Sequence, residues 1–394
     1  MTCLKKKILF LLFNFYFLLP SFAQDSSRLR ISLLTCTPGS ELYSTFGHSA
    51  FRIIDSSKAF NDWKDVVYNY GTFSFDDEGF YLKFVQGKLL YYVSATSFED
   101  FKYDYQSTNR GITEQVLNLT AAEKITVQQF LNNNLKEENK FYKYDFFFDN
   151  CTTRLRDILK SQYDSAFCQK AVMPVGSRFR QAIHQYLDKN NKDWSKLGID
   201  ILLGQPCDGV MTAEHMQFLP DNLMKSLDSS NHLMVVSSQN LYAITNENAK
   251  ATFFTPFVVF SLLAIFIVLI GYTKNKFAQA FLHGFDGLFF FLSGILGIIL
   301  IFMWVGTDHS MTKNNFNLIW AWPTHTIMAF FVSSKKTWVK KYFKFTAVAL
   351  LAVLISWFFL PQQMNNALIP IVLLLIYRSV KRSFATWSDA PSDH

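Results

Sequence analysis

Residues 141–162, FYKYDFFFDNCTTRLRDILKSQ, contain a change between two kinds of local sequence. The aromatic run up to Phe148 is typical of extended structure, whereas the apolar spacing from Cys151 onward predicts a helix. We therefore predict that Cys151 lies at or near the first turn of a helix. The unpaired N–H groups and partial positive charge of a helix start stabilise a thiolate and can hold an oxyanion. Cys151 is thus a candidate nucleophile, and the alternative is an inert buried cysteine.

The sequence before this junction predicts an α+β domain. One stretch, TAAEKITVQQFLNNNLKEEN (120–139), predicts a helix, because Thr120 and Glu123 have the spacing of a capping box. Four stretches are rich in β-branched and aromatic residues and read as strands: HSAFRIID (48–55), DVVYNYGTF (65–73), LLYYVSA (89–95) and TEQVLNL (113–119).

A nucleophilic thiol needs a base, and His48 is the best candidate in this domain. It opens a predicted strand, and Gly47 before it permits a close backbone approach. The alternative is a hydrogen-bonded structural histidine. The remaining histidines of the domain lie in later sequence without a clear pattern: His184, His215 and His232.

A third group orients the imidazole in sites of this kind. Asn69 is one candidate, because it lies on the strand predicted to pair with the strand of His48. Asp149 and Asn150 are two others, because they lie beside the cysteine. Asn150 has the alternative role of a helix cap. The sequence leaves the choice among the three residues open.

The composition narrows the class of protein. Hydrophobic residues make up 50% of the 394 residues, which is high for a wholly soluble chain. The net charge of +7 does not indicate a nucleic-acid partner, because many lysines and arginines lie at the ends of apolar runs. The five cysteines include no C-x-x-C pair, so no metal site is expected. One disulfide among Cys36, Cys168 and Cys207 is compatible with an oxidising compartment.

The chain begins with the layout of a secretory signal. Three lysines precede an apolar run, and Ser21-Phe22-Ala23 supplies small residues for cleavage before Gln24. We expect residues 1–23 to be a signal peptide, with an uncleaved anchor helix as the alternative. Residues 24–250 have the mixed composition of a soluble domain.

Five apolar runs predict an all-α membrane domain over residues 251–383. The runs occupy roughly 253–272, 284–304, 317–333, 345–360 and 366–378, each near the ~20 residues that cross a bilayer. Lysine and arginine collect in alternate loops, after the first, third and fifth runs, which indicates the cytoplasmic side. About five transmembrane helices therefore place the soluble domain outside the membrane and residues 384–394 in a cytoplasmic tail.

The loop after the second run, GTDHSMTKNNFN (306–317), faces the same side as Cys151 in this topology. Polar residues near membrane depth are candidates for function, here for substrate binding or support of the site. The candidates are Asp308, His309 and Asn317. The alternative is a plain solvated turn.

Several motifs, in one order, resemble the N-terminal extracytoplasmic domain of the bacterial lipoprotein N-acyltransferase family called Lnb. They are LLTCTPGSELYSTFGHSAFRI (33–53), VVYNYGTFSF (66–75), FYLKFVQGKLLYYV (80–93) and YDFFFDNCTTRLRDIL (144–159). TDH (307–309) and NNFNLIWAWP (314–323) extend the resemblance into the membrane part. The order of histidine before cysteine also resembles permuted papain-like domains of the NlpC/P60 clan, including the lecithin:retinol acyltransferase group. The resemblance therefore implies an α+β permuted papain-like domain before the membrane helices.

The resemblance also implies a reaction. A fatty acyl chain would pass from a membrane phospholipid to the α-amino group of the N-terminal diacylglyceryl-cysteine of a lipoprotein. His48 would deprotonate Cys151, and the thiolate would form a thioester that the amine resolves. The implied partners are the bilayer, the phospholipid and the diacylated lipoprotein, and no cofactor is required. Both lipids lie in the outer leaflet of the inner membrane, in agreement with the predicted topology.

Two other functions stay open at the level of the sequence. One is a membrane-anchored papain-like peptidase or amidase that acts on the cell wall. The other is a non-catalytic membrane assembly protein, in which Cys151 belongs to the core.

Overall fold

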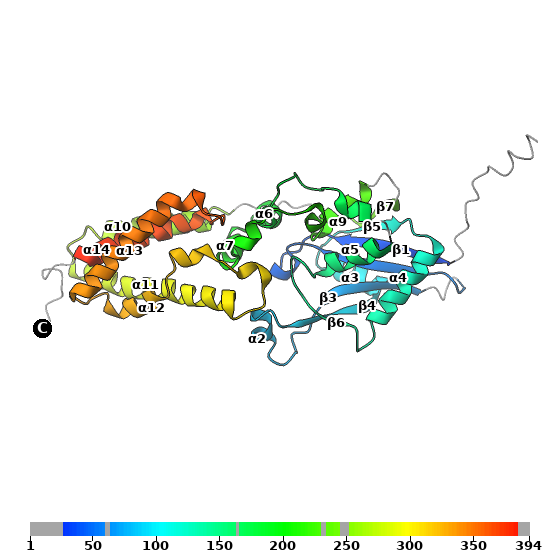
Figure 1. The fold of residues 1–394 in the computed structure, drawn as a ribbon, viewed down its shortest axis with the longest axis horizontal. Coiled ribbons are helices and arrows are strands. Elements are labelled where there is room, and N and C mark those ends of the chain that lie inside the picture. Colours follow the sequence, from blue (N-terminus) through cyan, green and yellow to red (C-terminus); the bar gives the residue numbers. More distant parts are fainter. Residues whose placement is uncertain (1–26, 60–63, 163–164, 230–233, 245–251, 385–394) are drawn as a thin grey trace, which may run out of the picture.

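The computed structural model describes residues 27–59, 64–162, 165–229, 234–244 and 252–384. The predicted signal peptide, His232 and the tail after residue 384 lie outside these ranges. The molecule is elongated, with a sheet domain at one end and a bundle of helices at the other (Figure 1). The helices α6 (Phe179–Lys189) and α7 (Asp193–Leu202) lie between the two ends.

The described residues form a seven-stranded antiparallel sheet in the order β6-β4-β3-β2-β1-β5-β7. The four strands predicted from the sequence are confirmed as β2, β3, β4 and β5, and β6 lies within the aromatic run before Cys151. The pattern missed β1 and β7. The strand bounds are β1 Leu29–Cys36, β2 His48–Asp55, β3 Lys64–Thr72, β4 Leu90–Ser97, β5 Ile112–Leu117, β6 Phe141–Lys143 and β7 Val235–Tyr242.

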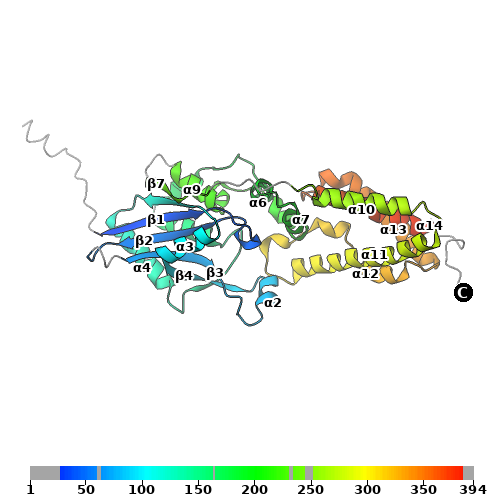
Figure 2. The same cartoon turned by 180° about the vertical axis from the view of Figure 1, so that it is seen from behind.

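Helices cover both faces of this sheet (Figure 2). Because side chains alternate along a strand, Leu33 and Leu34 of β1 point to opposite faces. Leu33 belongs to the core under α4 (Ala121–Asn134), α5 (Cys151–Gln162) and α9 (Pro220–Asp228). Leu34 belongs to a smaller core under α3 (Phe98–Ser107). The predicted capping box of α4 is confirmed, since Thr120 and Glu123 bond each other's backbone N–H groups.

Residues 165–229, which include the helices between the sheet and the bundle, contain more helical structure than their sequence suggested. His184 lies in α6 and is buried, and His215 lies in α8 (Ala213–Met216). Phe147 from the aromatic run, Phe179 of α6 and Met311 of the membrane part share one hydrophobic core. This core ties the segment to both ends of the molecule.

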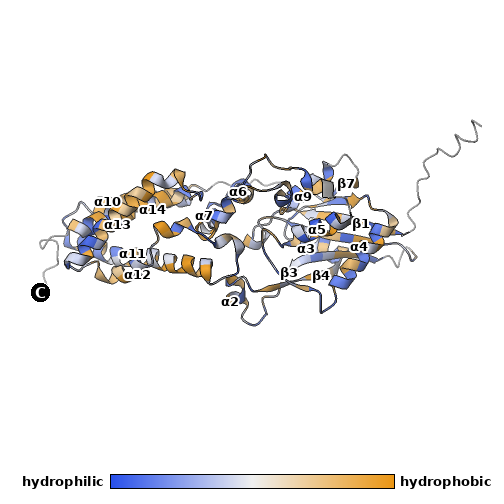
Figure 3. Cartoon of the chain, in the orientation of Figure 1, coloured by the Kyte–Doolittle hydropathy of each residue, from blue (hydrophilic) through white to orange (hydrophobic). Residues whose placement is uncertain are grey.

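The helices of the bundle are composed mainly of hydrophobic residues (Figure 3), and many of their large apolar side chains are exposed. In the described ranges two helices are long and apolar enough to cross a membrane, Lys276–Val305 and Thr337–Phe359. A third apolar helix, Pro256–Ile270, is shorter. The helices of the bundle are α10 Pro256–Ile270, α11 Lys276–Val305, α12 Thr324–Met328, α13 Thr337–Ser356 and α14 Ile369–Phe384.

The third predicted run, 317–333, is not one continuous helix. It is divided into the short pieces Phe316–Ile319, Thr324–Met328 and Ala329–Phe331. Pro323 lacks the N–H that a continuous helix needs at this point. The segment instead packs directly against two glycines of α11. A Cβ on Gly294 would collide with the backbone nitrogen of Thr326, and a Cβ on Gly297 would collide with the carbonyl oxygen of Ala321.

The predicted choice of disulfides is also corrected, because Cys36, Cys168 and Cys207 are all free. They are buried in three different hydrophobic cores of the described chain, so no two of them share a core. Each acts as a small apolar residue.

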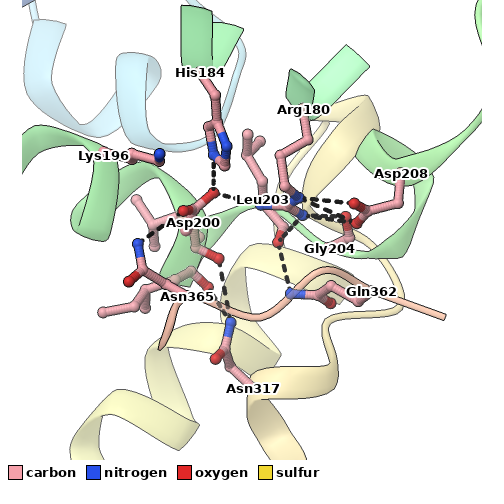
Figure 4. Close-up of polar contacts among 12 residues, drawn as sticks. Arg180, His184, Lys196, Asp200, Leu203, Gly204, Asp208, Asn317, Gln362 and Asn365 are labelled. Atoms are coloured by element: carbon pink, nitrogen blue, oxygen red, sulfur yellow. Dashed lines mark hydrogen bonds and ion pairs between the residues drawn. The ribbon is translucent and has the colours of Figure 1, made fainter. Parts of the chain in front are cut away.

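A buried charge cluster holds the short helices against the bundle (Figure 4). Arg180 of α6 donates two hydrogen bonds from Nε and Nη2 to Asp208, at 3.0 Å, and one from Nη1 to Asp200 of α7, at 2.8 Å. His184 Nε2 lies 2.8 Å from the same Asp200 oxygen. Burial raises the pKa of Asp200, but the hydrogen bond and charge of His184 and the charge of Arg180 outweigh it, and the pKa is lowered.

Two loops of the bundle bind the same cluster. Asn365 donates to the second carboxylate oxygen of Asp200 at 2.9 Å, and Asn317 donates to the Asp200 carbonyl at 3.3 Å. Gln362 donates to the carbonyl of Leu203 at 3.1 Å. The short helices are thus connected to the bundle through satisfied polar contacts.

This cluster leads to a stability prediction. Replacing Arg180→Met leaves two carboxylates without their buried cation, and such a loss costs roughly 3–5 kcal/mol. We expect a clear fall in the melting temperature of the detergent-solubilised protein in a thermal unfolding scan.

The matched control is Lys196→Met, which removes an ion pair with the half-exposed Asp188. Pairs of this kind contribute about 0–1 kcal/mol, so the melting temperature should hardly move. Equal effects of the two substitutions would contradict the structural role given to Arg180.

Candidate active site

Cys151 is the first residue of α5, as the sequence predicted. Asn150 caps this helix: its Oδ1 accepts hydrogen bonds from the N–H groups of Thr152 and Thr153, both at 2.8 Å. The Thr152 hydroxyl lies 3.1 Å from that of Ser49 on β2. The start of the helix is therefore fixed against the strand that carries His48.

His48 and Asn69 are brought together by neighbouring strands. The imidazole Nε2 of His48, on β2, lies 3.2 Å from Oδ1 of Asn69, on β3. This bond leaves the other ring nitrogen, Nδ1, for the thiol. Gly47 adopts φ +81°, and a Cβ there would lie 2.6 Å from the carbonyl oxygen of Cys36, so the residue before His48 has to be glycine.

The environment of Cys151 favours its thiolate. Burial raises the pKa of the thiol, but the charge and hydrogen bond of His48, the backbone N–H of Ser49 and the hydroxyl of Thr152 lower it. The net effect is a pKa lowered from 9.0 to about 7. At neutral pH a large fraction of the thiol is therefore ionised and nucleophilic.

The other two candidates for the third group are bonded elsewhere. Asp149 accepts hydrogen bonds from the guanidinium of Arg154 at 2.5 and 2.7 Å. Asn150 uses its Oδ1 in the helix cap and its Nδ2 on the carbonyls of Phe146 and Phe218, at 2.7 and 2.9 Å. Asn69 is the candidate that the structure places on the imidazole.

A cavity of about 560 Å³ opens at Cys151 and His48. Its volume falls in the ~300–1,000 Å³ range of small-molecule sites. The lining is mainly apolar and comes from the sheet, from α6, α7 and α9, and from the loop after α11. Aromatic rings dominate it: Phe46, Phe73, Phe84, Tyr91, Tyr144 and Phe218.

The loop 306–317 completes this cavity from the membrane side. His309 and Met311 line the cavity, and His309 Nε2 lies 3.1 Å from the carbonyl oxygen of Val85. Asp308 instead forms an ion pair with Lys143 at 2.8 Å. Asn317 belongs to the buried junction described above. Of the three loop candidates, His309 is therefore the one that lines the cavity.

In the ranges that the structure describes, no group of three or more histidine, cysteine or acidic side chains is arranged to hold a metal ion. The polar chemistry of the cavity comes from the cysteine, the histidine and their hydrogen-bond partners.

Fold and site together define a membrane-anchored protein with a cysteine–histidine pair in an apolar cavity just outside its helical bundle. Residues 22–186 match the Lnb N-terminal periplasmic domain, and residues 247–389 match the Lnb transmembrane domain. The chain therefore belongs to the Lnb family and is an inner-membrane protein with a periplasmic domain. No curated protein and no solved structure matches it.

The lowered pKa of Cys151 makes a prediction for its reactivity. The thiolate is present above the pKa and is lost as the pH falls through it, so the rate of alkylation by iodoacetamide should rise with a midpoint near pH 7. In His48→Gln, burial remains while the stabilising charge is removed, so the midpoint should move to 9.0 or above. Labelling of the Cys151 peptide, followed by mass spectrometry across pH, measures both midpoints.

The other described cysteines serve as internal controls. Burial raises the pKa of Cys36 to about 12, of Cys168 to about 11 and of Cys207 to about 12, so they should stay unlabelled in the folded protein. A midpoint near pH 9 in the wild type, or the same midpoint in both proteins, would show that His48 does not activate the thiol.

Proposed function

We propose that this protein is a lipoprotein N-acyltransferase with a phospholipid as acyl donor. The observation that carries the proposal is the position of Cys151: a nucleophilic thiol opens into an apolar cavity whose lining comes from both the periplasmic domain and the membrane part. An acyl chain fits such a lining. A phospholipid donor and a lipoprotein acceptor held in one leaflet require an active site at the surface of the bilayer.

The first half of the reaction loads the thiol. The Cys151 thiolate attacks the ester carbonyl carbon of the phospholipid, and the C–O bond to the glycerol oxygen breaks. His48, protonated by the thiol, passes that proton to the leaving oxygen, so lysophospholipid departs and an acyl thioester remains. Asn69 orients the imidazole and acts as a positioning residue.

The second half of the reaction transfers the chain. The α-amino group of the diacylglyceryl-cysteine attacks the thioester carbonyl, His48 accepts the proton of the amine, and the thiolate leaves. The product is an amide, and the enzyme returns to its starting state. The helix cap uses the N–H groups of Thr152 and Thr153, so we assign oxyanion stabilisation at the helix start to the N–H of Cys151 itself.

The proposal also includes the type of fold of the periplasmic domain and the topology of the chain in the membrane. A helix that starts at the cysteine and packs on the strand of an earlier histidine is the arrangement of a permuted papain-like domain. We place a signal peptide at 1–23, the periplasmic domain at 24–250, the membrane domain at 251–383 and a cytoplasmic tail at 384–394. Five crossings, with the broken segment 317–333 as the third, agree with the basic loops.

A cell-wall peptidase or amidase is the main rival, because it uses the same pair of residues. Its substrate is polar, and the mainly apolar lining of the cavity offers few hydrogen-bond partners to such a substrate. A non-catalytic assembly protein is the second rival, and it has no use for a thiol with a pKa of about 7.

The proposal predicts the acylation state of lipoproteins in cells. In cells that lack this protein, the N-terminal peptide of a lipoprotein should carry two acyl chains and a free amine, and the wild-type gene should add a third chain. Cys151→Ala and His48→Ala should leave the amine free. Asn69→Ala should slow acylation, on the order of 10²-fold, because the base loses its orientation.

Mass spectrometry of that peptide measures each state, with Asp149→Asn as a control that touches Arg154 and not His48. Normal acylation by Cys151→Ala would refute the mechanism. A wild-type protein that leaves the amine free while cell-wall fragments change would favour the peptidase.

A further inference from the structure

The short helix α2 (Phe80–Val85) and its flanks form an exposed apolar projection beside the cavity (Figures 1 and 2). We use the name α2 projection for residues 75–88. Tyr81 is 77% exposed and Leu82 is 62% exposed, and Phe75, Phe84 and Val85 are exposed as well. A cluster of this kind on a protein surface marks a contact with another apolar body.

The α2 projection lies at the level where the membrane helix α11 ends. Val305 is the last residue of α11, and three residues later the N–H of Asp308 donates to the carbonyl of Gln86 at 2.9 Å. The next residue, His309, bonds the carbonyl of Val85. A Cβ on Gly87, which has φ +68°, would come within 3.2 Å of His309. These contacts fix the projection directly above the membrane helix.

Exposed apolar side chains occur both at the end of the membrane helix and on the projection. Ile298, Phe302 and Val305 are exposed on the last turns of α11, and Leu82 and Phe84 are exposed on α2. Lys83 and Lys88 of the projection are also exposed. Apolar side chains flanked by lysines match the boundary between acyl chains and anionic head groups. The acidic residues of the projection, 76–78, precede α2 in the sequence.

Aromatic rings connect the projection to the reactive thiol. Phe84 is stacked on Phe80 with ring centres 6.0 Å apart, and Phe80 is stacked on Phe73 at 5.9 Å. Phe73 contacts Tyr91 at 5.3 Å, and Tyr91 is stacked on Tyr144 at 4.3 Å.

The last ring of this series lies beside Cys151. A Cβ on Gly71 would lie 3.9 Å from the ring of Tyr144 and 3.7 Å from the Cβ of Cys151. Four rings of the series also line the cavity: Phe73, Phe84, Tyr91 and Tyr144. A continuous apolar wall thus leads from the exposed face of α2 to the thiol.

We infer that the α2 projection inserts into the outer leaflet of the membrane and forms the lateral entrance through which a phospholipid acyl chain reaches Cys151. The partner is the bilayer itself. The entrance rests on the proposed function, whereas insertion into lipid does not. No bond is formed or broken at this step, because the projection binds and guides the chain.

Photocrosslinking in native membranes tests the insertion. Leu82→p-benzoylphenylalanine, in a Cys151→Ala background that cannot turn over, should form adducts with phospholipid that mass spectrometry detects. Leu288→p-benzoylphenylalanine on α11 is the positive control. Phe130→p-benzoylphenylalanine on α4 is the matched control, because Phe130 is an exposed apolar residue, at 48%, but lies on the sheet domain. A yield of lipid adducts at Leu82 that equals the yield at Leu288 supports the inference. A yield at Leu82 no higher than the yield at Phe130 overturns it.

A charge on the projection tests the entrance. Leu82→Asp should reduce acyl transfer from bilayer phospholipid about tenfold, because a carboxylate resists entry into the leaflet. The rate of Cys151 alkylation by iodoacetamide should stay unchanged, which shows that the pair is intact, and Phe130→Asp should change neither rate. Unchanged transfer in Leu82→Asp would overturn the entrance. If lipid adducts form at Leu82 but the wild-type protein acylates no lipoprotein, the proposed function is refuted and the insertion stands.

Discussion

Arg180 is a fully buried cation. The packing of the short helices α6 and α7 against the membrane part depends on the groups that neutralise its charge. A buried guanidinium is tolerated only when carboxylates and carbonyls satisfy it, and here Asp208, Asp200 and the carbonyls of Leu203 and Gly204 do so. Asp200 also accepts from Asn365 of the membrane part. The cluster therefore fixes the short helices α6 and α7 against the helical bundle. The proposed reaction, in which both substrates are lipids, needs an active site held in a fixed position relative to the membrane helices.

The thiol depends on a balance of two opposing effects. A cavity apolar enough for an acyl chain removes water from Cys151 and raises its pKa. His48, the N–H of Ser49 and the hydroxyl of Thr152 offset that effect locally. The cap formed by Asn150 and the contact between Ser49 and Thr152 keep these groups in register. A reactive thiolate and an apolar cavity can thus occur together.

Local sequence predicted the parts of the site that local geometry decides. The helix at Cys151 follows from a change of periodicity, and the pairing of His48 with Asn69 follows from two adjacent strands. The choice of Asn69 over Asp149 and Asn150 was not readable, because it depends on Arg154 and on carbonyls distant in sequence. The helices of residues 165–229 and the cluster around Arg180 were missed, since they depend on tertiary contacts. Arg180 bonds residues 20 and 28 positions away, and Asn317 and Asn365 bond Asp200 from more than a hundred positions away.

In the membrane part, too, the sequence predicted local features but not tertiary packing. Hydropathy located the apolar runs, but the break at Pro323 and the packing of Gly294 and Gly297 are tertiary features. The sequence of the α2 projection contributed only a motif to the family resemblance. Its position beside α11 was not predictable, because it depends on the tertiary fold.

The most direct test of the central claim is the mass of the purified protein after incubation with phospholipid vesicles in the absence of lipoprotein. A chain loaded on Cys151 adds the mass of one acyl group to the Cys151 peptide, is removed by hydroxylamine, and is chased by a diacylated lipopeptide. All three results are expected in the wild type and none in Cys151→Ala. A wild-type protein that stays unmodified while lipopeptide is nevertheless acylated would contradict a covalent thioester mechanism.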